Sequence, residues 1–262
     1  MEWAKMPTSA YLVMLMKLLR WIHTGWGLLG FGVVFLLLFP LLMIPVAFPR
    51  AFRLVGIINR WWAKLIFIIA FLPYRIEVRG KLDKNRQYIF SPNHFSYLDI
   101  PTMGLNPVNT LFVGKNDMEK IPLFGFMYRK LHITVDRSKL KSRFETMVKT
   151  LQALDEGKSL VIYPEGGIIS TTPPQMATFK DGAFRAAIEK QIPIVPVTIP
   201  HNWIILPDGD FLVRWGVITV IFHEPIETTG YTLDDIARLK GMVRDVITVE
   251  LEKQNSPAMA MA

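Results

Sequence analysis

A histidine and an aspartate, His94 and Asp99, stand five positions apart just after a short apolar run at residues 88–90. The run is typical of a buried strand, and a Ser-Pro-Asn sequence marks its end. A histidine at the end of a strand can act as a general base, and a nearby aspartate can orient its ring and stabilise the imidazolium. Ser96 and Asp99 also form the capping-box pattern of a helix that starts near Tyr97. Local sequence therefore leaves both a catalytic and a structural role open for the pair.

Other polar residues also follow predicted strands. Short strands and helices alternate from about residue 74 onward, which predicts a mixed or parallel α/β sheet covered by helices. Active sites of such sheets collect at the carboxyl ends of the strands. The residues found after predicted strand ends are the polar His94, Lys115, Asp136, Arg137 and Glu165, and the glycines Gly166 and Gly167. We therefore expect one site that brings these residues together.

The expected elements follow from periodicity and from turn residues. Strands are predicted at residues 74–79, 88–90, 110–113, 132–135, 160–163, 192–199, 213–215 and 217–222. Helices are predicted from about 144 to 154, from 183 to 190, and from a cap at Thr232 to about Leu251.

Composition excludes several kinds of chemistry. The 262 residues include no cysteine, so a thiol nucleophile, a disulfide framework and a cysteine-rich metal site are excluded. The remaining histidines have no paired spacing, and we expect structural roles for them: His23, His132, His201 and His223. We therefore expect neither a metal site nor a cofactor.

Positive charge is concentrated at the N-terminal end. Residues 1–80 carry nine Lys or Arg and two acidic residues, a net charge of +7, whereas residues 81–262 have a net charge of only +1. A segment that is both basic and apolar indicates an anionic lipid surface as partner. No RNA-binding, zinc-finger or basic-zipper pattern is present, so nucleic acid is not an expected partner.

The N-terminal segment has the pattern of a membrane anchor. Residues 25–48 carry no charge, which is long enough to cross a bilayer. Arg53, Arg60 and Lys64 then share one face of a basic amphipathic helix with tryptophans at interface depth. Basic residues flank both ends of the uncharged stretch, which favours a hairpin that returns to the same membrane face. A single span and a buried helix pair are the alternatives. We predict an anchoring hairpin at 1–72 and an α/β domain at 73–262.

Six motifs occur in an order that carries a resemblance. They are Asn93-His94-x4-Asp99, Lys115, Asp136-Arg137, Tyr163-Pro164-Glu165-Gly166, Phe179-Lys180-x-Gly182-Ala183 and Ile194-Val195-Pro196-Val197. Together they resemble the glycerolipid acyltransferase family that includes the 1-acylglycerol-3-phosphate acyltransferases, over about residues 74–225. The two-helix membrane motif of bacterial members is similar to residues 1–72.

The resemblance implies a reaction at the His94 site. An acceptor hydroxyl attacks an acyl thioester from acyl-CoA or acyl carrier protein, His94 takes its proton, and Asp99 orients and stabilises the imidazole. No acyl-enzyme is required, and no Gly-x-Ser-x-Gly nucleophile motif is present. Backbone amides near Gly166 and Gly167 are the candidates for stabilising the oxyanion.

The resemblance also implies a substrate and a location. The acceptor would be 1-acyl-sn-glycerol-3-phosphate and the product phosphatidic acid, made for phospholipid biosynthesis at the cytoplasmic face of the cell membrane. Lys115 and Arg137 occupy positions suited to the acceptor phosphate, and Lys180 is a third candidate, although Arg137 and Lys180 also fit solvated surface charges. The expected substrate-binding set is completed by Asn93, Glu165, Gly166 and Gly167.

One position departs from the family pattern. The family loop usually reads Glu-Gly-Thr-Arg or Glu-Gly-Gly-Arg, but here Ile168 stands where the arginine is expected. This leaves open another lyso-lipid acceptor, such as a lysophospholipid or an amino-acid lipid. A membrane-docked lipid-binding protein without catalysis is the remaining alternative.

Overall fold

The computed structural model describes residues 8–136 and 139–256, and its centre is one seven-stranded sheet. The strand order is β1-β7-β6-β2-β5-β3-β4, and β6–β7 is the one antiparallel pair. The strands are β1 (Tyr74–Val78), β2 (Ile89–Pro92), β3 (Thr110–Lys115), β4 (Ile133–Val135), β5 (Ser159–Ile162), β6 (Ile194–Thr198) and β7 (Ile218–Phe222). The predicted mixed sheet is confirmed.

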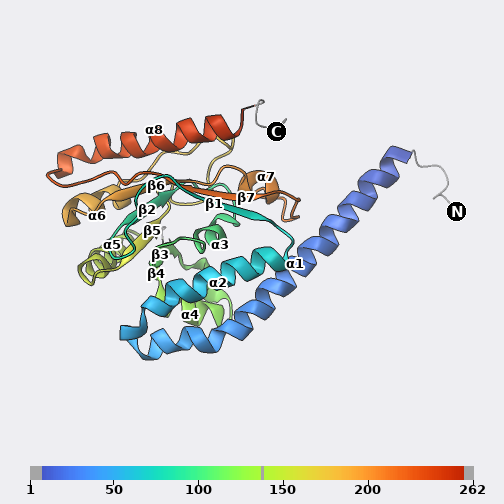
Figure 1. The fold of residues 1–262 in the computed structure, drawn as a ribbon, viewed down its shortest axis with the longest axis horizontal. Coiled ribbons are helices and arrows are strands. Elements are labelled where there is room, and N and C mark those ends of the chain that lie inside the picture. The colour runs from blue at the N-terminus through green and yellow to red at the C-terminus, as the bar shows by residue number, and fades with distance from the viewer. Residues whose placement is uncertain (1–7, 137–138, 257–262) are drawn as a thin grey trace.

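Helices cover both faces of this sheet (Figure 1). They are α1 (Thr8–Ala47), η2 (Pro49–Ala51), α2 (Arg53–Ile69), α3 (Asp99–Met103), η3 (Asn116–Lys120), α4 (Phe124–Leu131), α5 (Leu140–Asp155), α6 (Gly182–Lys190), α7 (Asn202–Ile205), η4 (Leu233–Asp235) and α8 (Ile236–Gln254). Side chains alternate along each strand, so Ile89 packs under α5, α6 and α8, whereas its neighbour Phe90 packs against α2 and α3. Both faces are therefore buried, which explains the continuous apolar runs of the central strands.

One predicted strand, 213–215, is not formed. Its backbone groups bond outside the sheet: the Val213 N–H donates to Thr24 Oγ1 at 2.9 Å, and the Arg214 N–H donates to Ile205 O at 2.7 Å. The loop 210–214 instead contacts α1: Arg20 Nη2 on α1 donates to Leu212 O at 2.5 Å and to Asp210 Oδ2 at 2.8 Å.

Helices α1 and α2 run antiparallel: Gly30 of α1 lies against Ile69 of α2, and the Phe35 ring of α1 lies against the Trp62 ring of α2 in a tilted arrangement. The stretch Tyr11–Ala47 has the length and composition needed to cross a membrane. Its N-terminal end, before Arg20, extends away from the rest of the molecule (Figure 1), and the large apolar side chains between Tyr11 and Ile22 are exposed. Insertion of these helices into a bilayer stays a prediction.

Helix α2 also belongs to the core of the sheet domain. Ala63 and Phe67 of α2, and Ala70 and Leu72 just after it, are buried in the cluster that covers one face of the sheet. The prediction that Arg60 faces lipid with Arg53 and Lys64 is wrong in this respect, because Arg60 is half-buried and bonds to the loop before β3. Its Nη1 donates to Asn106 O at 3.0 Å and to Pro107 O at 3.3 Å.

Candidate active site

His94 and Asp99 form a buried pair between β2 and α3. Asp99 Oδ2 accepts hydrogen bonds from the Phe95 and Ser96 N–H groups at 2.8 and 2.9 Å, and it lies 3.1 Å from His94 Nδ1. Asn202 Nδ2 donates to the other oxygen, Asp99 Oδ1, at 3.0 Å. Backbone capping therefore fixes the carboxylate where it can hold a proton on Nδ1, so the structural and catalytic interpretations describe the same contacts.

The ring of Tyr163 supports the imidazole from one side. The two ring centroids lie 4.1 Å apart in a stacked arrangement, and the Tyr163 hydroxyl donates to Asp99 O at 2.9 Å. Burial, together with the charge of Asp99, raises the pKa of Tyr163 well above its usual value. The phenol therefore stays neutral and acts as a rigid support.

Glu165 lies behind His94 and does not line the cavity in front of it. Its carboxylate is fully buried, and it accepts the His94 N–H at 2.7 Å on Oε1 and the Ala177 N–H at 2.8 Å on Oε2. Burial raises the pKa of Glu165 to about 7, although the two backbone hydrogen bonds oppose this shift. Glu165 was predicted among the substrate-binding residues, but here its carboxylate positions the His94 backbone.

Asn93, like Glu165, supports the site from behind the histidine. Its buried side chain accepts the Ile199 N–H at 2.7 Å and donates to Ile199 O at 2.9 Å. It thus joins the ends of β2 and β6 directly behind the histidine, and its side chain does not line the cavity.

A cavity of about 420 Å³ opens in front of the imidazole. We call it the reaction cavity; six of the residues that line it are His94, Lys115, Tyr163, Gly166, Gly167 and Ile168. Within residues 8–136 and 139–256, no hydrogen bond to His94 Nε2 is formed, so this nitrogen is available to a substrate. Lys115 brings a cation to the cavity wall, and Ile168 lines the wall at the position where the family pattern has arginine.

The glycine loop supplies backbone donors to the same cavity. Gly166 adopts φ +82°, a conformation that L side chains rarely adopt, and its N–H is already bonded to Tyr163 O at 3.1 Å. No hydrogen bond of the Gly167 N–H is found in the described part of the chain. Of the two predicted oxyanion donors, the Gly167 amide is therefore the one that remains available.

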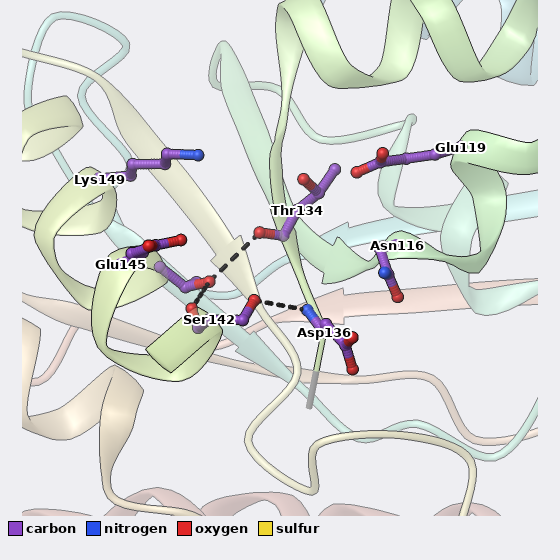
Figure 2. Close-up of a pocket in the computed structure, with 8 residues that line it drawn as sticks. Asn116, Glu119, Thr134, Asp136, Ser142, Glu145 and Lys149 are labelled. Carbon is purple, nitrogen blue, oxygen red and sulfur yellow. Dashed lines mark hydrogen bonds between the residues drawn. The ribbon is translucent and has the colours of Figure 1, made fainter. Parts of the chain in front are cut away.

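One predicted cation, Lys180, does not line this cavity, and another, Arg137, cannot be placed. Lys180 is exposed and lines a neighbouring cavity together with Pro164 and Gly166, and its backbone N–H donates to Pro164 O. Arg137 lies outside the described residues. Asp136, its neighbour, lines a third cavity, shown in Figure 2, and its N–H donates to Ser142 Oγ at 2.9 Å.

Sequence reasoning missed Asn202. It lies 103 positions from Asp99, and its amide is fully buried between Asp99 and Thr102 Oγ1. No local pattern identifies such a residue, because its partner is supplied by the fold. Among the described residues, no group of three or more His, Asp or Glu side chains could hold a metal ion. The expectation that no cofactor is used stays a prediction.

Comparison with known proteins identifies relatives of the chain. The Acyltransferase family model matches residues 75–200. The 1-acyl-sn-glycerol-3-phosphate acyltransferase of Saccharomyces cerevisiae is 32% identical over 204 residues, which cover 75% of this chain and 67% of that protein. The Haemophilus influenzae protein of the same name is 30% identical over 202 residues, covering 74% of this chain and 80% of the relative. The Limnanthes alba protein of that name is 30% identical over 185 residues, 70% of this chain and 65% of the relative.

A solved structure agrees in fold. The crystal structure of the 1-acyl-sn-glycerophosphate (LPA) acyltransferase PlsC from Thermotoga maritima superposes with a TM-score of 0.72 at 21% identity, over 90% of this chain and 98% of that one. At this identity the likeness supports the fold alone. The sequence relatives show the family, and they confirm the resemblance inferred from the motifs. The chain belongs to the glycerolipid acyltransferase family that includes the 1-acyl-sn-glycerol-3-phosphate acyltransferases.

Proposed function

We propose that this chain transfers a fatty acyl group from a thioester to the hydroxyl of 1-acyl-sn-glycerol-3-phosphate and so forms phosphatidic acid. The observation that carries the proposal is the His94 imidazole, held through Nδ1 by Asp99 and open through Nε2 to the reaction cavity. Its relatives from yeast and Haemophilus influenzae carry the name of this activity.

The arrangement accounts for each proton in the reaction. With its proton on Nδ1, His94 presents a lone pair at Nε2, which takes the proton of the acceptor hydroxyl as the oxygen attacks the thioester carbonyl carbon. Asp99 stabilises the resulting imidazolium. The Gly167 N–H faces the developing oxyanion, and collapse of the tetrahedral intermediate breaks the carbon–sulfur bond. His94 then returns the proton to the leaving thiolate, which departs as a thiol.

The acceptor phosphate requires a cation, because an unpaired buried charge is costly. Lys115 supplies one at the cavity wall. A second candidate acceptor, a lyso-lipid with a zwitterionic head group, is favoured by one observation: Asp208 lines the same cavity, and Ile168 leaves only one cation among the described lining residues. Arg137, which lies outside the described residues, is the remaining candidate for the phosphate.

We further propose that α1 and α2 attach the enzyme to the cytoplasmic face of the cell membrane, where the lyso-lipid resides. The long apolar α1 and the basic residues Arg53 and Lys64 on α2 support this attachment. We propose that residues 1–72 form the anchoring domain and that residues 73–262 form the acyltransferase domain.

The test is a measurement of thiol release by the full chain purified in detergent. Acyl-CoA is offered with lysophosphatidate, a zwitterionic lyso-lipid and an uncharged lyso-lipid, with the His94→Ala variant as matched control. We expect turnover with lysophosphatidate that disappears in the variant. Faster turnover with the zwitterionic acceptor would favour the second candidate. Thiol release that is equal in the wild type and the variant would refute the mechanism.

A further inference from the structure

A second cavity lies beside the reaction cavity. We call it the side cavity; it measures about 390 Å³, and six of its lining residues are Val113, Arg143, Met147, Tyr163, Gly166 and Lys180. Three residues, Val113, Tyr163 and Gly166, line both cavities. The two cavities therefore adjoin at residues of β3 and of the loop after β5, which include the tyrosine that stacks on His94.

The proposed reaction needs room for two substrates. The acceptor hydroxyl must lie near His94 Nε2, which places the lyso-lipid in the reaction cavity. The donor thioester must reach the same point from another direction. In acyl-CoA and in acyl carrier protein the thioester ends the same phosphopantetheine arm, a chain of methylenes and amides with a phosphate at its far end. A donor site must therefore combine a cationic mouth with a largely apolar channel that leads to His94.

The side cavity has the cations and the apolar wall, and it adjoins the reaction cavity. Arg143 on α5 and Lys180 just before α6 bring two cations to it, and no Asp or Glu is among the described residues that line it. Neither cation forms an ion pair with a carboxylate in the part of the chain that the structure describes. Val113, Met147 and Ala183 supply apolar wall. Two uncompensated cations at one opening favour a phosphate group.

The third cavity provides a contrast within the same region. It measures about 190 Å³ and is lined by Glu119, Asp136 and Glu145 with Lys149 (Figure 2). It meets the side cavity at Thr146, which lines both. The carboxylates of the third cavity form ion pairs with Arg129, Lys139 and Lys141. The side cavity has two cations and no carboxylate among its described lining residues, so it suits an anionic ligand better than the third cavity does.

We propose that the side cavity binds the phosphopantetheine arm of the acyl donor, with the phosphate between Arg143 and Lys180 and the thioester end beside Tyr163. The proposal rests on the proposed function for the identity of the donor. It assigns Lys180 to the donor, whereas the sequence had suggested a contact with the acceptor phosphate. It also explains why Lys180 and Lys115 line different cavities: one cation serves the donor and the other serves the acceptor.

The first experiment measures binding without turnover. The full chain in detergent is titrated with 4′-phosphopantetheine and with pantetheine, which differ only in the phosphate. We expect the phosphorylated probe to bind about tenfold more tightly, as a charge-assisted hydrogen bond predicts. The Arg143→Ala and Lys180→Ala variants should lose most of this preference. Lys141→Ala, an exposed cation on the same helix that does not line the cavity, should keep it.

Two results of this titration would overturn the assignment. One is a wild type that binds both probes equally, and the other is a preference that survives in both Arg143→Ala and Lys180→Ala. Neither result depends on which lyso-lipid is acylated. Failure of the proposed function and failure of this inference are therefore distinguishable.

The second experiment separates the donor from the acceptor. In Lys180→Ala the KM for the acyl donor should rise about fivefold to tenfold while the KM for the lyso-lipid stays constant, and Lys180→Arg should restore the donor KM. The measurement is made with acyl-CoA and with acyl carrier protein, and the wild-type kcat/KM identifies the preferred source. Equal losses with both donors support the shared phosphate. A loss confined to acyl-CoA, which points to the adenosine phosphates, or a rise in the KM for the lyso-lipid would overturn the proposal.

Discussion

The substitution Asp99→Asn isolates the charge that Asp99 places beside His94. Two backbone N–H groups point at Oδ2, from Phe95 and Ser96. The amide oxygen of the new side chain will therefore take the Oδ2 position, where it still accepts the Nδ1 proton of His94. The tautomer is preserved, and only the negative charge is lost.

The amide nitrogen then takes the Oδ1 position, where it faces the donor Asn202 Nδ2, which lies 3.0 Å from Oδ1 in the wild type. A flip of the Asn202 amide removes this conflict, since its Oδ1 is buried and has no hydrogen-bond partner among the described residues. The flip gives up one neutral hydrogen bond to Thr102 Oγ1, about 1 kcal/mol. A domain of about 5–15 kcal/mol stability survives this loss, so the variant should fold.

The effect on the rate is larger than the effect on stability. A hydrogen bond to a charged group is worth about 1.5–3 kcal/mol, so losing the charge should lower kcat by roughly 10- to 150-fold. His94→Ala, which removes the base itself, should lower it by about two to four orders of magnitude.

The assay is single-turnover thiol release at saturating donor and acceptor. Thr102→Val is the matched control, because it disturbs the same buried cluster and leaves the charge in place; it should stay within about threefold of the wild type. A wild-type rate for Asp99→Asn, or a loss as large as that of His94→Ala, would refute the assignment of the charge.

Three further predictions follow from other contacts. The pKa of Glu165 is raised from 4.5 to about 7, so its contribution to stability is present below about pH 4.5 and is lost as pH rises to about 7. The wild-type Tm should therefore fall over this pH range, and Glu165→Gln should remove that fall. Identical pH profiles of Tm for the wild type and the variant would contradict this prediction. Ile168→Arg should raise kcat/KM for lysophosphatidate about tenfold relative to an uncharged lyso-lipid; equal changes for both would argue against a phosphate in this cavity. Arg60→Glu should lower Tm, because it breaks the hydrogen bond to Asn106 O. The double variant Arg53→Glu, Lys64→Glu should instead weaken binding to anionic vesicles more than binding to neutral vesicles in a flotation assay. The reverse pattern would show that Arg60 faces lipid.

Much of the sheet could be predicted because its central strands are buried on both faces. Residues such as Ile89 and Phe90 are apolar in succession for that reason, and turn residues mark where the runs end. The segment 213–215 has the same local pattern, but its backbone groups bond to α1 and to Ile205. Periodicity cannot distinguish these two outcomes, since it reports burial and not the partner.

The candidate site was predictable only where its parts are close in sequence. His94 and Asp99 are close enough for their spacing to suggest a contact, and the structure forms it. Asn202 has no such signal because the fold supplies its partner from 103 positions away. Lys180 follows the glycine loop in sequence, yet it lines the side cavity and not the reaction cavity that His94 lines, a placement that is set by the fold and not by sequence spacing.

The packing of α2 has a practical consequence for anyone who wishes to obtain this enzyme without detergent. Phe67 and Leu72 are buried against the sheet together with Tyr88 and Phe90. Burying one such side chain is worth about 1.5–3 kcal/mol, so deleting residues 1–72 would expose a core face and remove a large share of a typical domain's stability.

A water-soluble form would therefore be reached by redesign and not by truncation. The side chains to exchange are the exposed apolar ones of α1 and those on the outer surface of α2, namely Ile57, Trp61 and Ile68. The inner surface of the same helix must be kept, because the catalytic domain uses it as a wall.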